Sequence, residues 1–321
     1  MTSTRALVTG GCGFVGSRLC GYLVARGFDV ITVDNCSLGA PSNISSSVAQ
    51  KIVCEVGDVR DVGTMQRCIH QYQPKVVFHL AAMHYIPACD ANPKVCIDIN
   101  VGGTQAVLDA CNGARSVEAV VLTSSAAVYE PSSEAHSELS ALGPVDIYGH
   151  SKLWAEQLVA LFHRKTGISA GIARLFNVFG PGETNPHIIP SFILQIQRRT
   201  DLRVGDLSTC RDYIFVDDVC SGLAALAQVA PAQGLLTCNL GGEQQYDGSA
   251  IVKAIGDLVG HTPILQVEPR RLRPADRPYL VSDCTRAHDV LGWRAQTDLS
   301  AGLSAAIRQP IAPSLDPASI A

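Results

Sequence analysis

The 321-residue sequence lacks the features that mark membrane, nucleic-acid-binding and disulfide-stapled proteins. No apolar run approaches the ~20 residues of a membrane-spanning helix, and the first residues lack a signal-peptide pattern. There is no block of basic residues and the net charge is −4, so nucleic acid is not expected as a partner. None of the twelve cysteines forms a Cys-X-X-Cys pair. We therefore expect reduced, mostly buried thiols in a cytoplasmic protein, with neither a disulfide framework nor a metal site.

The sequence does contain, over residues 5–34, a pattern that predicts dinucleotide binding. An apolar run at 6–8 is followed by GGCGFVG at 10–16, by apolar residues at helical spacing over 17–27, and by a second run that ends in Asp34. A turn without side chains lets a pyrophosphate approach the N–H groups at the helix start. Glycines alone would also fit turns and packing, but the whole strand–turn–helix–strand unit favours binding. A carboxylate at Asp34 would accept hydrogen bonds from ribose and repel a 2′-phosphate, which favours NAD over NADP.

Beyond this unit, strand and helix patterns alternate, which predicts an α/β fold with a Rossmann-like, doubly wound parallel sheet. We expect strands at 30–34, 52–56, 75–80, 119–123, 169–175 and 236–240, and helices at 17–27, 62–72, 95–111, 148–165 and 216–229. Two loops are expected, a polar one at 35–47 and a long one with Pro87 and Pro93. Examples of the expected buried thiols are Cys20, Cys54 and Cys96.

The pattern changes after residue 180, where prolines interrupt it. We expect residues 1–180, rejoined by about 214–242, to form the NAD-binding domain. Residues 181–213 and 243–321 are expected to form a smaller substrate-binding α/β region. Ligands of parallel sheets lie at the carboxyl ends of the strands, so the residues that follow each strand should line the site.

Tyr148 and Lys152 stand four apart on the expected helix and therefore share one face. Tyrosine is a poor base, with an unperturbed pKa of ~10, and a nearby cation lowers that pKa. With Ser125 at the end of a strand, the set could take the proton of an alcohol while a hydride leaves to NAD. Such a pair is often only solvated, but the preceding dinucleotide unit favours catalysis.

At this point the sequence resembles the extended short-chain dehydrogenases/reductases, in particular the NAD-dependent sugar-nucleotide epimerases and dehydratases. The resemblance extends from Arg5 to about Trp293. Its motifs, in chain order, are GGCGFVG (10–16), VDN (33–35), GDVRD (57–61), HLAA (79–82), NVGGT (100–104), SSAAVYE (124–130), YGHSK (148–152), RLFNVFGPG (174–182), RDYIFVDDV (211–219) and LGW (291–293).

The resemblance implies roles for individual residues. The implied catalytic residues are Ser125, Tyr148 and Lys152. The implied cofactor positions are Gly10, Gly13, Phe14, Val15, Gly16, Asp34, Asn35, Asp58, Val59, Leu80, Ala81, Ala82, Asn100, Tyr148 and Lys152. The implied substrate positions are Ser125, Asn177, Arg211, Arg273, Asp276 and Leu280. Asn177 and Arg211 match diphosphate-binding positions, Arg273 and Asp276 the nucleoside end, and Leu280 the position beside the sugar's 2-substituent. For Arg211 and Arg273, a surface ion pair is the simpler alternative.

Departures from the family pattern narrow the reaction. Family members that eliminate water or carbon dioxide usually carry an acid directly after the position of Ser125, where this chain has Ala126 and Ala127. We therefore favour epimerisation, with a UDP-hexose 4-epimerase as the specific hypothesis. His84 takes the place of a common Gln or Lys near the pyrophosphate, or simply packs in its loop. Glu130 and Leu207 each replace a common glycine.

Two alternatives remain open. One is a reductase, dehydratase, decarboxylase or net oxidase on the same scaffold, and the other is a non-catalytic NAD-binding regulatory or scaffold protein. An intact Ser125, Tyr148 and Lys152 set disfavours the second. The family commonly dimerises through the two helices expected at 95–111 and 148–165, which implies a homodimer.

Overall fold

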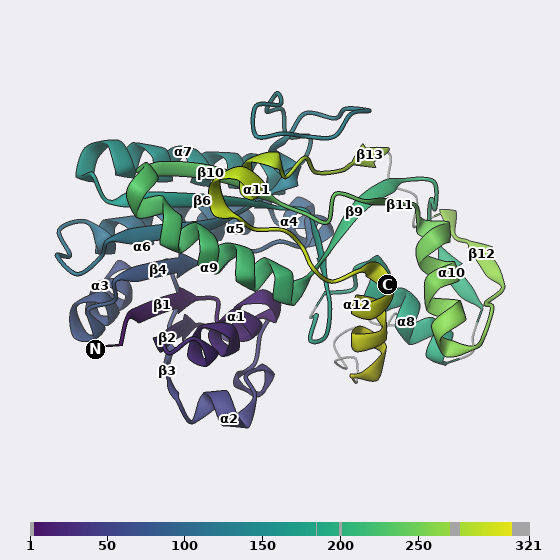
Figure 1. Ribbon diagram of the computed structural model, residues 1–321, viewed down its shortest axis with the longest axis horizontal. Coiled ribbons are helices and arrows are strands. Elements are labelled where there is room, and N and C mark those ends of the chain that lie inside the picture. Colours follow the sequence, from purple (N-terminus) through teal and green to yellow (C-terminus); the bar gives the residue numbers. More distant parts are fainter. Residues whose placement is uncertain (1–2, 184, 199–200, 270–276, 310–321) are drawn as a thin grey trace.

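The computed structural model describes residues 3–183, 185–198, 201–269 and 277–309. Its centre is a parallel sheet of seven strands in the order β10-β6-β5-β4-β1-β2-β3 (Figure 1). The strands are β1 (Arg5–Thr9), β2 (Asp29–Asp34), β3 (Ile52–Val56), β4 (Val76–His79), β5 (Ala119–Ser125), β6 (Ser169–Leu175) and β10 (Leu235–Leu240). The predicted doubly wound α/β class is confirmed.

Helices cover both faces of this sheet because each presents an apolar stripe to it. On one face, α1 (Phe14–Ala25) and α9 (Val216–Gln233) contribute buried residues such as Leu19 and Leu223. On the other, α3 (Val62–Tyr72), α6 (Gly103–Cys111) and α7 (Ile147–Thr166) contribute Met65, Val107 and Val159. No helix in these described ranges is long and apolar enough to span a membrane.

A smaller layer follows the main sheet and supplies the second wall of the site. Strand β9 (Cys210–Phe215) pairs with β7 (Asn177–Phe179), β11 (Gln245–Tyr246) and β13 (Tyr279–Leu280), while β8 (Leu202–Val204) pairs with β12 (Leu265–Val267). Helices α8 (Ile188–Gln197), α10 (Gly248–Val259) and α12 (Leu299–Arg308) pack with them in a separate apolar core. A further helix, α11 (Thr285–Leu291), packs against α9 and β10.

Most predicted elements are confirmed, and β3, β6 and α3 have the predicted bounds. The predicted strand at 236–240 does return to the main sheet, where it pairs with β6. The helix expected from residue 17 begins three residues earlier, at Phe14. The apolar spacing could not reveal that first turn, because Gly13 and Gly16 have no side chains that could contribute to the pattern.

The two predicted loops are partly helical. Residues 35–47 contain the short turn η1 (Pro41–Asn43) and the start of α2 (Ser46–Ala49). The loop predicted around Pro87 and Pro93 contains α4 (Ile86–Ala91) and the start of α5 (Pro93–Ile97). Proline is tolerated in the first helical turn, where its missing N–H has no intrahelical partner. A proline there therefore starts a helix and does not exclude one.

The helix predicted at 95–111 is interrupted by one wider turn. Helix α5 continues into the π-helical turn η2 (Asp98–Gly102) and then into α6. Such turns are often found at functional sites, because the extra residue turns a side chain out of the regular helical register. Here the turn contains Asn100, whose side chain is buried.

A buried ion pair holds α7 against the sheet. Glu156 of α7 bonds to Arg174 of β6 at 2.7 Å and also accepts a hydrogen bond from Ser124 of β5. The side chains of the pair are only 7% and 6% exposed. Removing one partner of such a pair typically costs ~3–5 kcal/mol. The pair therefore fixes α7, which contains Tyr148, relative to the end of β5.

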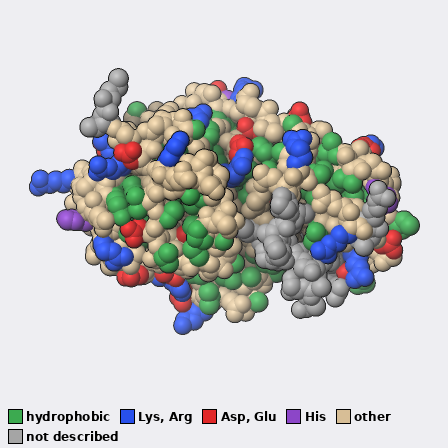
Figure 2. Space-filling model, turned by 90° about the horizontal axis from the view of Figure 1, so that it is seen from below, with side chains coloured by type: hydrophobic (Ala, Val, Ile, Leu, Met, Phe, Trp, Pro, Cys, Tyr) green, Lys and Arg blue, Asp and Glu red, His purple; other side chains and the backbone are tan. Residues whose placement is uncertain are grey.

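The cysteines and the charged surface largely follow expectation. All twelve cysteines are free thiols and most are buried, including Cys20 and Cys96. Cys54 is exposed and was wrongly expected to be buried, because β3 is the edge strand of the sheet. On the face shown in Figure 2, basic side chains are dispersed among acidic, apolar and other ones.

Candidate active site

A cavity of about 1160 Å³ lies between the carboxyl ends of the main sheet and the smaller layer. Its lining includes all but three of the residues predicted for the site. These lining residues are Gly10, Gly13, Phe14, Val15, Gly16, Asp34, Asn35, Asp58, Val59, Leu80, Ala81, Ala82, Ser125, Tyr148, Lys152, Asn177, Arg211 and Leu280. Of the other three, Asn100 lies behind the wall, and Arg273 and Asp276 lie outside the described residues.

The glycine-rich turn brings bare backbone to one end of this cavity. Gly10 has φ +74°, and a Cβ there would lie 2.8 Å from the backbone nitrogen of Ala81. A Cβ on Gly16 would lie 2.1 Å from the Gly10 carbonyl oxygen. Helix α1 starts directly after Gly13 without a side-chain cap. The turn and the uncapped helix start therefore fit the pyrophosphate of a dinucleotide.

The predicted cofactor residues Asp34, Asn35 and Asp58 lie in the lining together with this turn. The Asp34 carboxylate accepts hydrogen bonds from the backbone N–H groups of Cys12 at 2.8 Å and Cys36 at 2.7 Å. The Asn35 amide donates to Asp58 at 3.0 Å. The Arg60 guanidinium, bonded to Asp58, holds the pKa of that carboxyl well below its usual range. The Asp34 and Asp58 carboxylates thus lie side by side in the lining, each held by hydrogen bonds.

Asn100 lies outside the lining but is hydrogen-bonded to a residue that belongs to it. Its side-chain oxygen accepts from the Met83 N–H at 2.7 Å, and its nitrogen donates to the Met83 carbonyl at 2.9 Å and the Ser151 hydroxyl at 2.8 Å. The loop after β4, which contains Leu80 to Ala82, is therefore tied to helix α7. This contact explains how a residue outside the lining could support the cofactor site.

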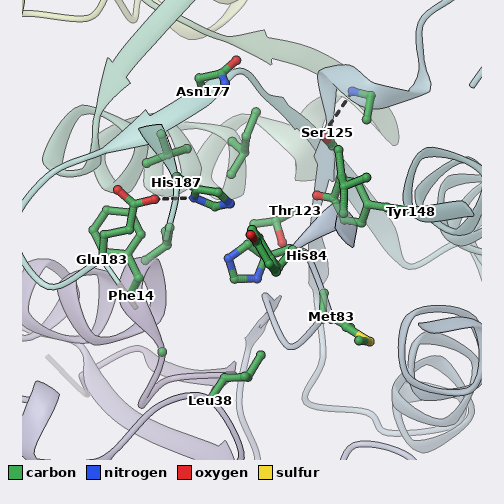
Figure 3. A pocket seen from close by; sticks show the side chains of 18 of the residues that line it. Phe14, Leu38, Met83, His84, Thr123, Ser125, Tyr148, Asn177, Glu183 and His187 are labelled. Carbon is green, nitrogen blue, oxygen red and sulfur yellow. Dashed lines mark hydrogen bonds and ion pairs between the residues drawn. The ribbon is translucent and has the colours of Figure 1, made fainter. Parts of the chain in front are cut away.

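The three predicted catalytic residues all line the cavity, and Figure 3 shows Ser125 and Tyr148 together on one side of it. The Tyr148 and Ser125 side chains lie beside each other in the lining. The Lys152 ammonium donates to the Thr123 carbonyl at 2.8 Å. Asp146 caps helix α7 by accepting a hydrogen bond from the Gly149 N–H at 2.7 Å. This cap fixes the first turn of the helix, which contains Tyr148.

The electrostatics of Tyr148 and Lys152 differ from expectation. Burial lowers the pKa of Lys152 to about 8. Burial also raises the pKa of Tyr148. In the chain by itself, desolvation of the phenolate therefore outweighs the lowering expected from the nearby cation. A positively charged nicotinamide beside the phenol would lower this pKa.

Strand pairing brings together the predicted substrate residues of the smaller layer. Asn177 lies on β7 and Leu280 on β13, and both strands flank β9, which holds Arg211. Leu280 is directly paired with Arg211 and is buried. Ala126 and Ala127 also line the cavity, so neither position offers an acid.

Of the three residues that depart from the family pattern, two lie in the cavity lining and one lies outside it. His84 and Leu207 line the cavity, and Leu207 packs over Gly248. Glu130 is exposed and lies outside the lining.

Several charged or titratable lining residues were missed from the sequence, among them Glu183, His187 and Arg277. Glu183 is buried and bonded to the Nδ1 atom of His187. Arg277 donates to the Ala127 carbonyl at 2.8 Å. The only sequence signals were a Glu and a His four apart in a proline-rich stretch, and an Arg directly after Asp276.

Comparisons with known proteins agree with this geometry. The model of the NAD-dependent epimerase/dehydratase family matches residues 6–241. A UDP-glucose 4-epimerase from Streptomyces lividans is 32% identical, over 93% of this chain and 94% of that protein. The solved structure of a UDP-glucose 4-epimerase from Brucella ovis in complex with NAD is 29% identical, with a TM-score of 0.88, covering 95% of this chain and 98% of that one. That of a UDP-glucose 4-epimerase from Thermotoga maritima with UDP-glucose is 25% identical, with a TM-score of 0.86, covering 95% and 97%.

The Asp34 carboxylate predicts the choice between the two nicotinamide dinucleotides. Calorimetric titration of cofactor-free protein should show NAD binding at least about tenfold tighter than NADP, because a 2′-phosphate would face this carboxylate. The Asp34→Asn substitution should reduce the difference between the affinities for NAD and NADP. Asp29→Asn, which removes a charge from the opposite, exposed end of β2, should leave it unchanged. Equal affinities in the unmodified protein would contradict the prediction.

Proposed function

Because the chain belongs to the NAD-dependent epimerase/dehydratase family, we propose that it is an NAD-dependent epimerase that inverts C4 of a UDP-hexose. The observation that carries the proposal is the single cavity that joins a dinucleotide cradle, the Ser125–Tyr148–Lys152 set and the diphosphate positions Asn177 and Arg211. The named UDP-glucose 4-epimerases that the chain resembles over nearly its full length support this choice of substrate.

In this proposal, each residue of the catalytic set has its own role. NAD, when bound, supplies a hydride acceptor that also returns the hydride. Tyr148 takes the proton of the sugar 4-hydroxyl and gives it back after the keto-sugar has turned its other face. Ser125 holds the hydroxyl in line, and Lys152 stabilises the phenolate. Because Ala126 and Ala127 offer no acid, the intermediate is reduced again and keeps its water.

The two regions of the chain have separate tasks in this proposal. Residues 1–180 and about 214–242 bind the cofactor, and residues 181–213 and 243–321 bind the nucleotide sugar. The free thiols support a reducing compartment, the cytoplasm. Partners of the protein are the nucleotide sugar and a second copy of the chain.

The function is tested directly by incubating the purified protein with a panel of nucleotide sugars, without added cofactor. NMR should show the C4 epimer of a UDP-hexose, and mass spectrometry should show unchanged mass. Tyr148→Phe should lower turnover by ~10²-fold or more while NAD remains bound, since a general base is lost. A product lighter by one water, or near-normal turnover of the mutant, would contradict the proposal.

Leu280 sets the proposed sugar specificity. Its buried side chain packs with Ala126, Val128 and Phe176 beside the catalytic end of the cavity. A residue of intermediate bulk should accept plain hexoses and disfavour N-acetylhexosamines, since steric overlap in a packed site costs ~1–3 kcal/mol.

We predict that Leu280→Ser raises the relative kcat/KM for the N-acetyl sugar and that Leu280→Tyr abolishes its use. Leu258→Ser, on the exposed side of α10, should leave the ratio unchanged. A ratio that stays flat across both Leu280 variants would remove Leu280 from the sugar pocket.

Apolar side chains on α5 and α7 support a homodimer. Trp154 and Leu161, two helical turns apart, are each 38% exposed, and Val95 is 43% exposed. Burying such residues against a second copy removes apolar surface from water.

Light scattering after size exclusion should therefore give twice the monomer mass, and Trp154→Asp should give a folded monomer. Leu139→Asp, on an exposed loop, serves as the matched control and should remain dimeric. A Trp154→Asp protein that is still dimeric would place the interface elsewhere.

A further inference from the structure

Two loops from opposite walls of the cavity touch each other across it. The loop after β4 contributes His84 and Tyr85 to the lining, and the segment before α8 contributes His187. Asn185 belongs to the same segment, outside the lining. The Asn185 amide bonds to the Nε2 atom of His84 at 2.8 Å. The His187 ring lies 5.9 Å from that of His84 and 5.8 Å from that of Tyr85, between ring centroids. These contacts connect residues about a hundred positions apart in sequence.

The protonation state of His84 suits a stable hydrogen bond with Asn185. Burial lowers its pKa to about 3, so the imidazole is neutral at physiological pH. A neutral imidazole has one donor and one acceptor nitrogen. Because the Asn185 amide nitrogen can only donate, Nε2 of His84 is the acceptor in the bond between them. Asn185 is itself buried, so water does not readily replace this bond.

Both ends of the contact are anchored to rigid parts of the fold. On the cofactor side, Met83 is held through its N–H and its carbonyl by Asn100. On the other side, buried Glu183 bonds to His187 and orients its ring. Helix α8, which starts at the next residue, packs its Phe192 into the apolar core of the smaller layer.

The contact lies between the two ends of the proposed dinucleotide site. In Figure 3, His84 lies between the side of the cavity that holds Phe14 and the side that holds Tyr148. A dinucleotide that reaches from the glycine-rich turn to Tyr148 must pass His84 on the way. A contact that joins both walls at this point therefore opposes its departure.

We propose that His84, Tyr85, Asn185 and His187, oriented by Glu183, form a clasp that closes over the bound dinucleotide and slows its release between turnovers. The inference rests on the proposed function, in which the cofactor is regenerated within each turnover and retention favours continued catalysis. The clasp is a positioning and retention device, separate from the proton transfer at Tyr148.

The test measures release of NAD and not epimerisation. Protein loaded with NAD is mixed with excess alcohol dehydrogenase and ethanol, which convert released NAD to NADH and report it by absorbance. Asn185→Leu and His84→Phe should each release NAD about tenfold faster, the equivalent of ~1.4 kcal/mol. The double variant should be no faster than either single variant, since both changes remove the same bond.

Two further variants complete the design. His84→Gln retains a side chain that can bond to Asn185 and should keep release slow. His70→Phe, an exposed histidine on α3, is the matched control and should behave as the unmodified protein. If His84→Phe does not fold, Asn185→Leu and His84→Gln still decide the question.

The outcomes separate the clasp from the function on which it rests. Release that is unchanged in Asn185→Leu, or additive effects in the double variant, would overturn the clasp while leaving the epimerase proposal intact. Absence of NAD binding by the unmodified protein in calorimetry would overturn the epimerase proposal and the clasp with it.

Discussion

The close contact between helix α1 and the turn that precedes it is the constraint on which the rest of the site depends. The turn is bonded to β2 through the Gly10 N–H and the Val33 carbonyl at 2.9 Å, and it abuts Ala81 after β4. No side chain fits between Gly16 and Gly10. Three strand ends and one helix start therefore meet where backbone lies directly against backbone. This leaves N–H groups of the helix facing the cavity.

The opposite end of the cavity depends on helix α7. The Glu156–Arg174 ion pair and the Asp146 cap fix its position and its first turn, so that Tyr148 faces Ser125. The same burial that orders these residues opposes ionisation of the phenol and weakens the charge on Lys152. A positively charged nicotinamide beside the phenol would oppose this effect of burial.

The second wall comes from a part of the chain that does not belong to the main sheet. Strand β9 contains Arg211, which is paired with Leu280, and it also pairs with the strand of Asn177. The segment before helix α8 reaches back to His84. Because the cavity has one wall from each layer, its shape depends on contacts between the layers. Titratable side chains such as Glu183 and His187 lie at this junction. Function of the site therefore depends on the packing of the two layers as much as on either one.

The sequence by itself determined the features that are local. Glycine spacing, the i to i+4 placement of Tyr148 and Lys152 and the alternation of strands and helices depend on backbone geometry over a few residues. The tertiary structure alone decided the rest. It exposed Cys54 on an edge strand, raised the pKa of Tyr148 by burial and brought Asn185 to His84. Burial and long-range contact depend on how whole elements pack, and that packing leaves no periodic signal in the residues concerned.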